Sequence, residues 1–135
     1  MSQDNVEIVR SCIDGWNRGD FDWWMRCCHP DAEFHSSLTR QSEGGERAWR
    51  GTVEVRRFVD ELQRLWEELS FEVFETRDVG DSVVALGRAK VRGRASGVAL
   101  ESPIAYVFEF DGGLVRRTTA YLDHDEALKA VGLEE

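Results

Sequence analysis

His35 is the residue best suited to proton transfer, and it stands in a short segment of alternating polarity. Histidine titrates near neutral pH and often serves as a general acid or base. We predict a catalytic role for His35, although alternation with Phe34 could also turn its side chain away from a cavity. Arg117 is the second predicted catalytic residue, because a guanidinium stabilises developing negative charge. The alternative for Arg117 is a rim position, paired with Glu101, Glu109 or Asp123.

The predicted ligand-binding residues lie in two alternating segments on either side of Asp111-Gly112-Gly113. If Asp111-Gly112 is a two-residue hairpin turn, Phe108 pairs with Val115 and Tyr106 pairs with Arg117. We assign the more aromatic face of this pair of strands to the inside of the molecule, and a slip of one residue would invert the assignment. That face holds Ser102, Ile104, Tyr106, Phe108, Val115, Arg117, Thr119 and Tyr121.

The two tyrosines, Tyr106 and Tyr121, are expected to donate phenolic hydrogen bonds to a ligand, or else to be core aromatics with one satisfied hydroxyl. Trp49 and Trp66 are predicted to face the same cavity or the core. One of the two adjacent tryptophans at positions 23 and 24 is expected at its mouth, because a helix cannot bury both equally. Tryptophans at such positions more often form core than a binding surface, so packing is the alternative for all of them.

Apolar spacing predicts an α+β domain in which helices come first and strands follow. Helical periodicity marks the N-terminal part, with Asp4 and Thr52 as predicted N-caps, and from Phe71 the period changes to two. We therefore expect a strongly curved antiparallel or mixed sheet wrapped around N-terminal helices, a cone with an internal pocket. The predicted single domain spans residues 1–135, with helices at about 4–16, 20–28 and 52–69, short strands at 32–36 and 47–50, a loop at 37–47, strands at about 71–79, 82–94, 98–110 and 114–123, and a short helix at 124–131.

Composition excludes several classes of protein. The formal net charge of −9 over 135 residues argues against nucleic-acid binding, which depends on lysine and arginine to neutralise phosphates. No apolar run approaches the roughly 18 residues that a membrane span requires. The polar first residues do not resemble a signal peptide, so we expect a cytoplasmic protein with no membrane partner.

The three cysteines, Cys12, Cys27 and Cys28, form neither a disulfide framework nor a recognisable zinc-ligand spacing. An odd number of cysteines, two of them adjacent, suits a reducing cytoplasm. We expect buried or half-exposed thiols at a helix end and no metal site.

The order and spacing of several short motifs resemble a SnoaL-like member of the nuclear transport factor 2-like superfamily, over about residues 5–133. The motifs are Trp16-Asn17-Arg18-Gly19-Asp20, His29-Pro30-Asp31-Ala32-Glu33-Phe34, Trp49-Arg50-Gly51 with Val55-Arg56-Arg57-Phe58, Asp111-Gly112-Gly113-Leu114-Val115-Arg116 and Tyr121-Leu122-Asp123. The resemblance implies a cone-shaped pocket and a homodimer formed through the outer face of the sheet. It also implies a small, largely apolar or partly polar ligand.

For activity the resemblance leaves two possibilities. One is an isomerase, cyclase or hydrolase that works by proton transfer without a cofactor, and the other is a non-catalytic ligand-binding or dimerisation domain. Ketosteroid isomerases need a tyrosine, a carboxylate base and a protonated acid, which would fall near Cys12 or Ile13, near Ser36 and near Tyr106. None of the three is retained. The aspartate of SnoaL-type cyclases corresponds to Thr119, so the reaction is not identified.

Overall fold

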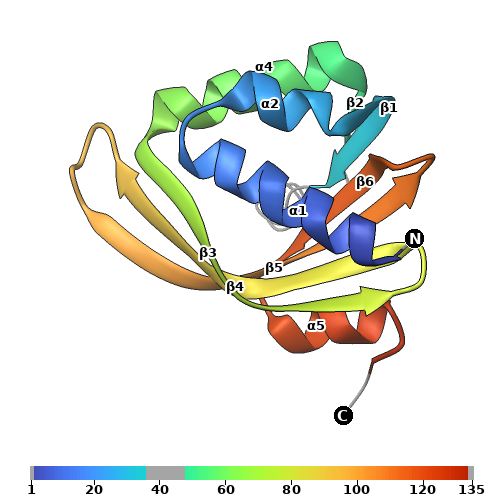
Figure 1. Cartoon of the computed structure of the whole chain (residues 1–135). Helices are drawn as coiled ribbons and strands as arrows, with labels where there is room; N and C mark the ends of the chain where they lie inside the picture. The colour runs from blue at the N-terminus through green and yellow to red at the C-terminus, as the bar shows by residue number, and fades with distance from the viewer. Residues whose placement is uncertain (1, 36–47, 134–135) are drawn as a thin grey trace.

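A computed structural model describes residues 2–35 and 48–133 of the chain. Figure 1 shows a strongly curved sheet with helices on both faces. On the concave face lie α1 (Ser2–Asn17), α2 (Phe21–Arg26) and α4 (Gly51–Leu65), and α5 (His124–Ala130) packs beneath the convex face. The predicted α+β class, with a curved sheet around N-terminal helices, is confirmed.

Six strands of the described residues form one open sheet in the order β2-β1-β6-β5-β4-β3. The pair β1 and β6 is parallel and the other neighbouring pairs are antiparallel, so the sheet is mixed. The parallel pair places the N-terminal strand β1 beside the C-terminal strand β6, although about 80 residues separate them. The strands are β1 (Cys28–His35), β2 (Ala48–Arg50), β3 (Trp66–Val79), β4 (Ser82–Gly93), β5 (Ala99–Asp111) and β6 (Leu114–Tyr121).

Several predicted boundaries are wrong. The helix expected to reach residue 69 ends at Leu65, and Trp66 already has the extended backbone of β3. A β-bulge between Trp66 and Glu68 lets Trp66 and Leu69 face the same side at a spacing of three, which also fits a helix and explains the error. Helix α1 begins at Ser2 and α4 at Gly51, so neither Asp4 nor Thr52 is an N-cap. The expected loop at 37–47 lies outside the described residues.

Gly87 of β4 lies at a close contact between strands. A Cβ atom at this position would stand 1.8 Å from the carbonyl oxygen of Glu72 on β3. On the partner strand the pairing shifts between Val73 and Glu75, which marks a β-bulge. Glycines and bulges occur together where a strand bends sharply. We infer that this pair of features produces the curvature that opens the concave face.

Both faces of the sheet are buried against helices. Inward-facing side chains of the central strands, such as Val83 and Phe108, pack with Val9 and Ile13 of α1. Their neighbours along the chain, such as Val84 and Val107, face outward and pack against Ala127 and Leu128 of α5. The alternating side chains of each strand therefore belong to two separate cores.

The predicted register of β5 and β6 is wrong. The turn residues are Gly112 and Gly113, both with positive φ as a two-residue hairpin turn requires, instead of Asp111 and Gly112. Moving the turn by one residue keeps every side chain on its predicted face. A second shift, between the pairs Glu109–Arg117 and Phe110–Val115, then inverts the faces of β6 beyond it.

As a result Thr118 lies opposite Phe108 and faces inward. Arg117, Thr119 and Tyr121 lie on the convex side, so the predicted inner face is correct for the β5 residues and for Val115 and wrong for the rest of β6.

Candidate functional site

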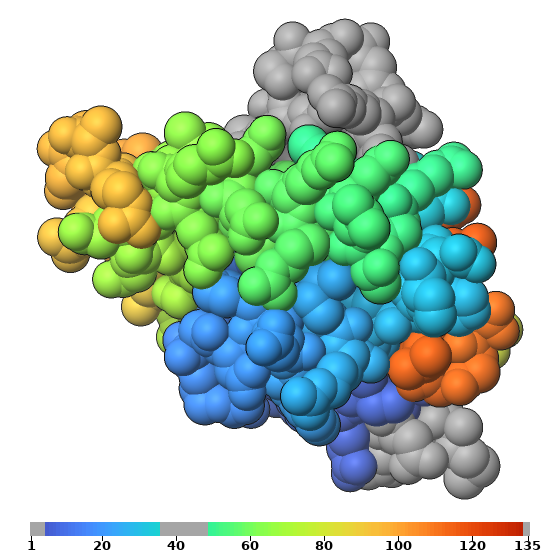
Figure 2. All heavy atoms as spheres, turned by 90° about the horizontal axis from the view of Figure 1, so that it is seen from above, coloured from blue at the N-terminus to red at the C-terminus, as the bar shows by residue number. Residues whose placement is uncertain are grey.

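A cavity of about 400 Å³ lies between the concave face of the sheet and the helices that cover it. Seen from above, α4 and α2 lie side by side over this face (Figure 2), and Arg56 of α4 forms an ion pair of 3.0 Å with Asp22 of α2. The lining is mainly aromatic and aliphatic, which suits a small apolar molecule. It comprises Ile13, Trp16, Trp24, Phe34, Phe58, Leu62, Trp66, Leu69, Ser70, Phe71, Ala89, Val91, Leu100, Glu101, Ser102, Ile104, Tyr106, Phe108, Thr118, Ala120 and Leu122.

Tyr106 is the central polar residue of this lining. Its ring packs edge-on against Phe71, with 4.9 Å between ring centroids, and lies 6.4 Å from the ring of Phe34. Its hydroxyl forms no hydrogen bond with any residue that the structure describes. Burial raises the pKa of Tyr106 to about 12, because the phenolate would be poorly solvated. At neutral pH Tyr106 is therefore a neutral phenol with an unused donor that lines an apolar cavity.

Other polar groups in the cavity are few. Ser102 donates its hydroxyl to the carbonyl oxygen of Pro103 at 3.1 Å. Glu101 is half-exposed and forms an ion pair of 3.1 Å with Arg88. No histidine, cysteine, lysine or arginine lines the cavity within the described part of the chain. Tyr106 is thus the best-placed donor for a ligand held inside.

The tryptophans divide between the cavity wall and the surface. Trp16, Trp24 and Trp66 line the cavity, and Trp16 donates its indole N–H to the carbonyl oxygen of Leu69 at 3.0 Å. Trp49 stacks on Phe58 at 5.2 Å and is not one of the lining residues. Trp23 is exposed and Trp24 is buried, so the two adjacent tryptophans have different roles as predicted.

A second, more polar pocket lies on the convex side, between β1, β5, β6 and the end of α5. It brings together four of the predicted site residues: His35, Arg117, Thr119 and Tyr121. His35 and Thr119 are direct neighbours in the β1–β6 pairing. Phe34 points into the cavity. Because side chains alternate along β1, His35 therefore faces the convex side, as one of the two predicted alternatives allowed. The predicted residues therefore form two groups on opposite faces, with Trp66, Tyr106 and Phe108 in the first cavity.

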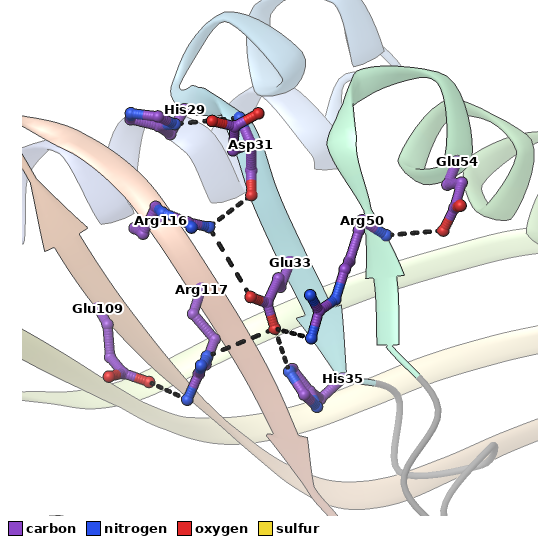
Figure 3. Close-up of polar contacts among 9 residues, drawn as sticks. All are labelled: His29, Asp31, Glu33, His35, Arg50, Glu54, Glu109, Arg116 and Arg117. Atoms are coloured by element: carbon purple, nitrogen blue, oxygen red, sulfur yellow. Dashed lines mark hydrogen bonds and ion pairs between the residues drawn. The ribbon is translucent and has the colours of Figure 1, made fainter.

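Glu33 organises the polar side chains beside this second pocket (Figure 3). Its side chain is only 9% exposed, and its Oε1 atom lies 3.1 Å from Nε2 of His35. An ionised carboxylate only accepts hydrogen bonds, so Nε2 of His35 is the donor in this contact. Three arginines surround the same carboxylate at longer distances: Arg50 at 3.7 Å, Arg117 at 3.8 Å and Arg116 at 3.9 Å.

These contacts explain the ionisation of Glu33. Burial alone would raise the pKa of this carboxyl group, but the hydrogen bond from His35 and the charges of Arg117 and Arg50 outweigh it and lower the pKa. Glu33 lies in one of the sequence motifs, but no role was predicted for it. Its position between Ala32 and Phe34 in an alternating strand was the sequence feature that could have identified it as a partly buried carboxylate.

The curved sheet around helices is the architecture of nuclear transport factor 2-like proteins. A model of the SnoaL-like domain matches residues 9–118, and the chain belongs to this family. No protein of curated function matches the sequence.

Solved structures share the fold at low sequence identity. An NTF2-like protein of unknown function from Burkholderia pseudomallei has a TM-score of 0.80 and 19% identity, with 96% of this chain and 98% of that chain covered. TerC, co-crystallised with polyporic acid, has a TM-score of 0.78 and 18% identity, with 95% and 98% covered. A SnoaL-like protein from Jannaschia, described as a polyketide cyclase, has a TM-score of 0.77 and 21% identity, with 99% and 95% covered.

Two further properties concern the described residues alone. None of their helices combines the length and apolar character that a membrane crossing requires. Within residues 2–35 and 48–133, no group of three or more histidine, cysteine, aspartate or glutamate side chains is arranged to hold a metal ion.

Proposed function

We propose that the concave cavity binds a small, largely apolar molecule that carries one hydrogen-bond acceptor, such as a carbonyl oxygen. The observation that carries this proposal is the free hydroxyl of Tyr106 among apolar lining residues. A partly buried phenol that faces an apolar cavity without a hydrogen-bond partner favours a ligand that accepts its hydrogen bond. The co-crystallised compound of TerC is consistent with a ligand-binding role for this fold, and it is not evidence for the same ligand here.

The size and charge of the cavity restrict the ligand further. A volume of about 400 Å³ accommodates a molecule of one to three rings. The only charged residue among the described lining residues, Glu101, is 54% exposed and already paired with Arg88. A ligand with a charged group deep in the cavity would lack a counter-ion, so we propose a neutral ligand.

The test uses two probes of similar shape, 2-acetonaphthone and 2-ethylnaphthalene, and isothermal titration calorimetry. Tyr106→Phe removes only the hydroxyl and is expected to weaken binding of the ketone about tenfold, a loss of about 1.4 kcal/mol, because one buried hydrogen bond is lost. Binding of the hydrocarbon should change less than twofold. Tyr121→Phe makes the same chemical change on the convex side and should leave both affinities unchanged.

Equal loss of both probes in Tyr106→Phe would mean that the tyrosine supports packing and donates no hydrogen bond. Failure of wild type to bind either probe in the cavity would contradict the choice of ligand class.

The second pocket supports another candidate function: cofactor-independent proton transfer. The observation in its favour is the His35–Glu33 contact of 3.1 Å beside Arg117. Here Glu33 orients the ring, Nδ1 of His35 removes a proton, and Arg117 stabilises the resulting negative charge. Because the sheet separates this pocket from the cavity, its substrate would be a different, more polar molecule.

Exchange of the methyl protons of pyruvate in D₂O, followed by NMR, tests this second function. Wild type should accelerate the exchange, His35→Ala should abolish the acceleration, and Arg117→Ala should reduce it at least tenfold. An acceleration that survives in both variants would contradict these assignments.

We also propose that the chain forms a homodimer through the convex face outside α5. Ala89 lines the cavity, so Arg88 faces the convex side, where its guanidinium lies 5.5 Å from the centre of the Phe74 ring. Phe74 is 58% exposed, which is unusual for a phenylalanine and suits an interface. Ion pairs of Arg88 with Glu72 and Glu101 surround it and would form a polar rim.

A further inference from the structure

Cys12 and Cys27 are far apart in sequence, but the fold brings them into one packed cluster. Cys12 lies on α1 and is only 2% exposed, whereas Cys27 follows the last residue of α2 and is half-buried. Both belong to the cluster formed by Trp24, Val55 and Val59. The loop and helix between positions 12 and 27 thus return the chain to the same point in the structure.

Within this cluster the two thiols lie close enough to change each other's ionisation. This contact raises the pKa of Cys12, together with burial, and lowers the pKa of Cys27. Cys27 is therefore the partner that more readily carries negative charge. Cys28 differs, because burial raises its pKa to about 12 and its thiol lies 3.5 Å from the carbonyl oxygen of Trp24.

We propose that Cys12 and Cys27 form a disulfide on reaction with a hydroperoxide, and that this modification site controls the shape of the cavity. The half-buried Cys27 reacts first, because it is the more exposed member of the pair and the thiolate is the nucleophile. Cys12 is the resolving thiol, since it lies in the same packed cluster as Cys27. The bond ties α1 to the junction between α2 and β1.

The chemistry takes place in two steps. The sulfur of Cys27 attacks the hydroperoxide, the O–O bond breaks, and protonation of the leaving oxygen gives an alcohol (or water from hydrogen peroxide) and a sulfenic acid on Cys27. The sulfur of Cys12 then attacks the sulfur of Cys27, the S–O bond breaks, and the hydroxyl group leaves as water with the proton of Cys12. Two thiols are oxidised by two electrons in total, and the hydroperoxide is reduced.

The proposed control of the cavity rests on the ligand-binding function proposed above. Ile13, next to Cys12, and Trp24, three residues before Cys27, both line the cavity. A disulfide holds its sulfurs about 2.05 Å apart, closer than two thiols that are not bonded to each other, so α1 and the end of α2 must move together. Trp24 also packs edge-on against Trp16, with ring centroids 5.3 Å apart. A displacement of α2 therefore also affects Trp16, a third lining residue.

The crosslink is tested by peptide mapping of the full chain. Reduced protein is treated with a small excess of hydrogen peroxide, blocked with iodoacetamide and digested with trypsin. We expect the peptides of residues 11–18 and 27–40 to be joined, with two of the three thiols lost and Cys28 alkylated. Cys28→Ser should form the same crosslink, and Cys12→Ala should not. Three alkylated thiols, or a bond that includes Cys28, would overturn the proposal. Both of these outcomes can be observed in wild-type protein, so the test does not depend on the variants folding.

The effect on the cavity is measured separately, as 2-acetonaphthone affinity before and after oxidation. We expect at least a threefold change that dithiothreitol reverses and that Cys12→Ala lacks. A crosslinked protein with unchanged affinity would contradict the coupling. If the reduced protein binds no probe, the ligand-binding function fails, while the peptide map still decides the crosslink.

Discussion

At the scale of single residues, the two tyrosines illustrate how position determines chemistry. Tyr106 and Tyr121 are the same residue type on neighbouring strands, and the sequence pattern predicted that both would line the cavity. Only Tyr106 lines it, because the β6 strand is shifted relative to β5. Its place in an apolar cavity raises its pKa to about 12, so the phenol keeps its proton further into the alkaline range than a free tyrosine does.

The raised pKa of Tyr106 predicts a loss of stability at high pH. An unfolded tyrosine ionises near pH 10, whereas Tyr106 in the folded protein keeps its proton until about pH 12. Stability from this group is therefore complete below pH 10 and decreases as pH rises toward 12.

Between pH 9 and pH 11 the free energy of unfolding of wild type should fall about 1 kcal/mol more than that of Tyr106→Phe, measured by urea denaturation. Parallel pH profiles for the two proteins would show that the phenol is not shielded in the folded state.

At the scale of elements, the central strands were predictable and the position of β6 was not. Alternation over Phe71 to Phe110 is strong, and the inward set of β5 (Ile104, Tyr106 and Phe108) is confirmed. The bulge near Arg116 has no comparable signal, since Arg116 and Arg117 are equally polar and either one suits an exposed position. One inserted residue exchanges the two faces, which moved Arg117, Thr119 and Tyr121 away from the predicted cavity.

The bend in the sheet depends on one glycine, and its substitution is the prediction at this scale. Gly87→Ala should destabilise the fold by more than about 2 kcal/mol, because its Cβ atom would overlap a backbone oxygen that cannot rotate away. Thermal denaturation should show a decrease in Tm of at least about 5 °C.

Gly93→Ala is the matched control on the same strand. There the new Cβ atom would meet only the hydroxyl of Ser96, the end of a side chain that can change rotamer. A Tm for Gly87→Ala as high as that of Gly93→Ala would contradict the proposed role of Gly87 in the bend.

At the scale of the whole molecule, the sheet separates two environments. The concave side holds an apolar cavity beneath α1, α2 and α4, and the convex side holds α5, a charged cluster around Glu33 and an exposed surface around Phe74. The family and the presence of a pocket could be predicted from motifs and periodicity. The division of His35 and Tyr106 between two faces could not, because it depends on strand register.

The proposed dimer predicts a mass of twice 15.4 kDa by sedimentation equilibrium at micromolar concentration. Phe74→Glu should shift the protein toward monomer, because it places a charge in the apolar part of the interface. Leu65→Glu, at a 64% exposed position at the end of α4, is the matched control and should remain dimeric. Monomeric wild type, or equal dissociation of both variants, would contradict the proposed interface.

The most direct measurement of the central claim is a crystal structure of the protein with 2-acetonaphthone. We predict that the ketone lies in the concave cavity, in contact with Trp66 and Phe108, with its oxygen within about 3.2 Å of the hydroxyl of Tyr106. A ketone bound in the convex pocket beside His35, or a cavity closed by rearranged tryptophans, would contradict the claim.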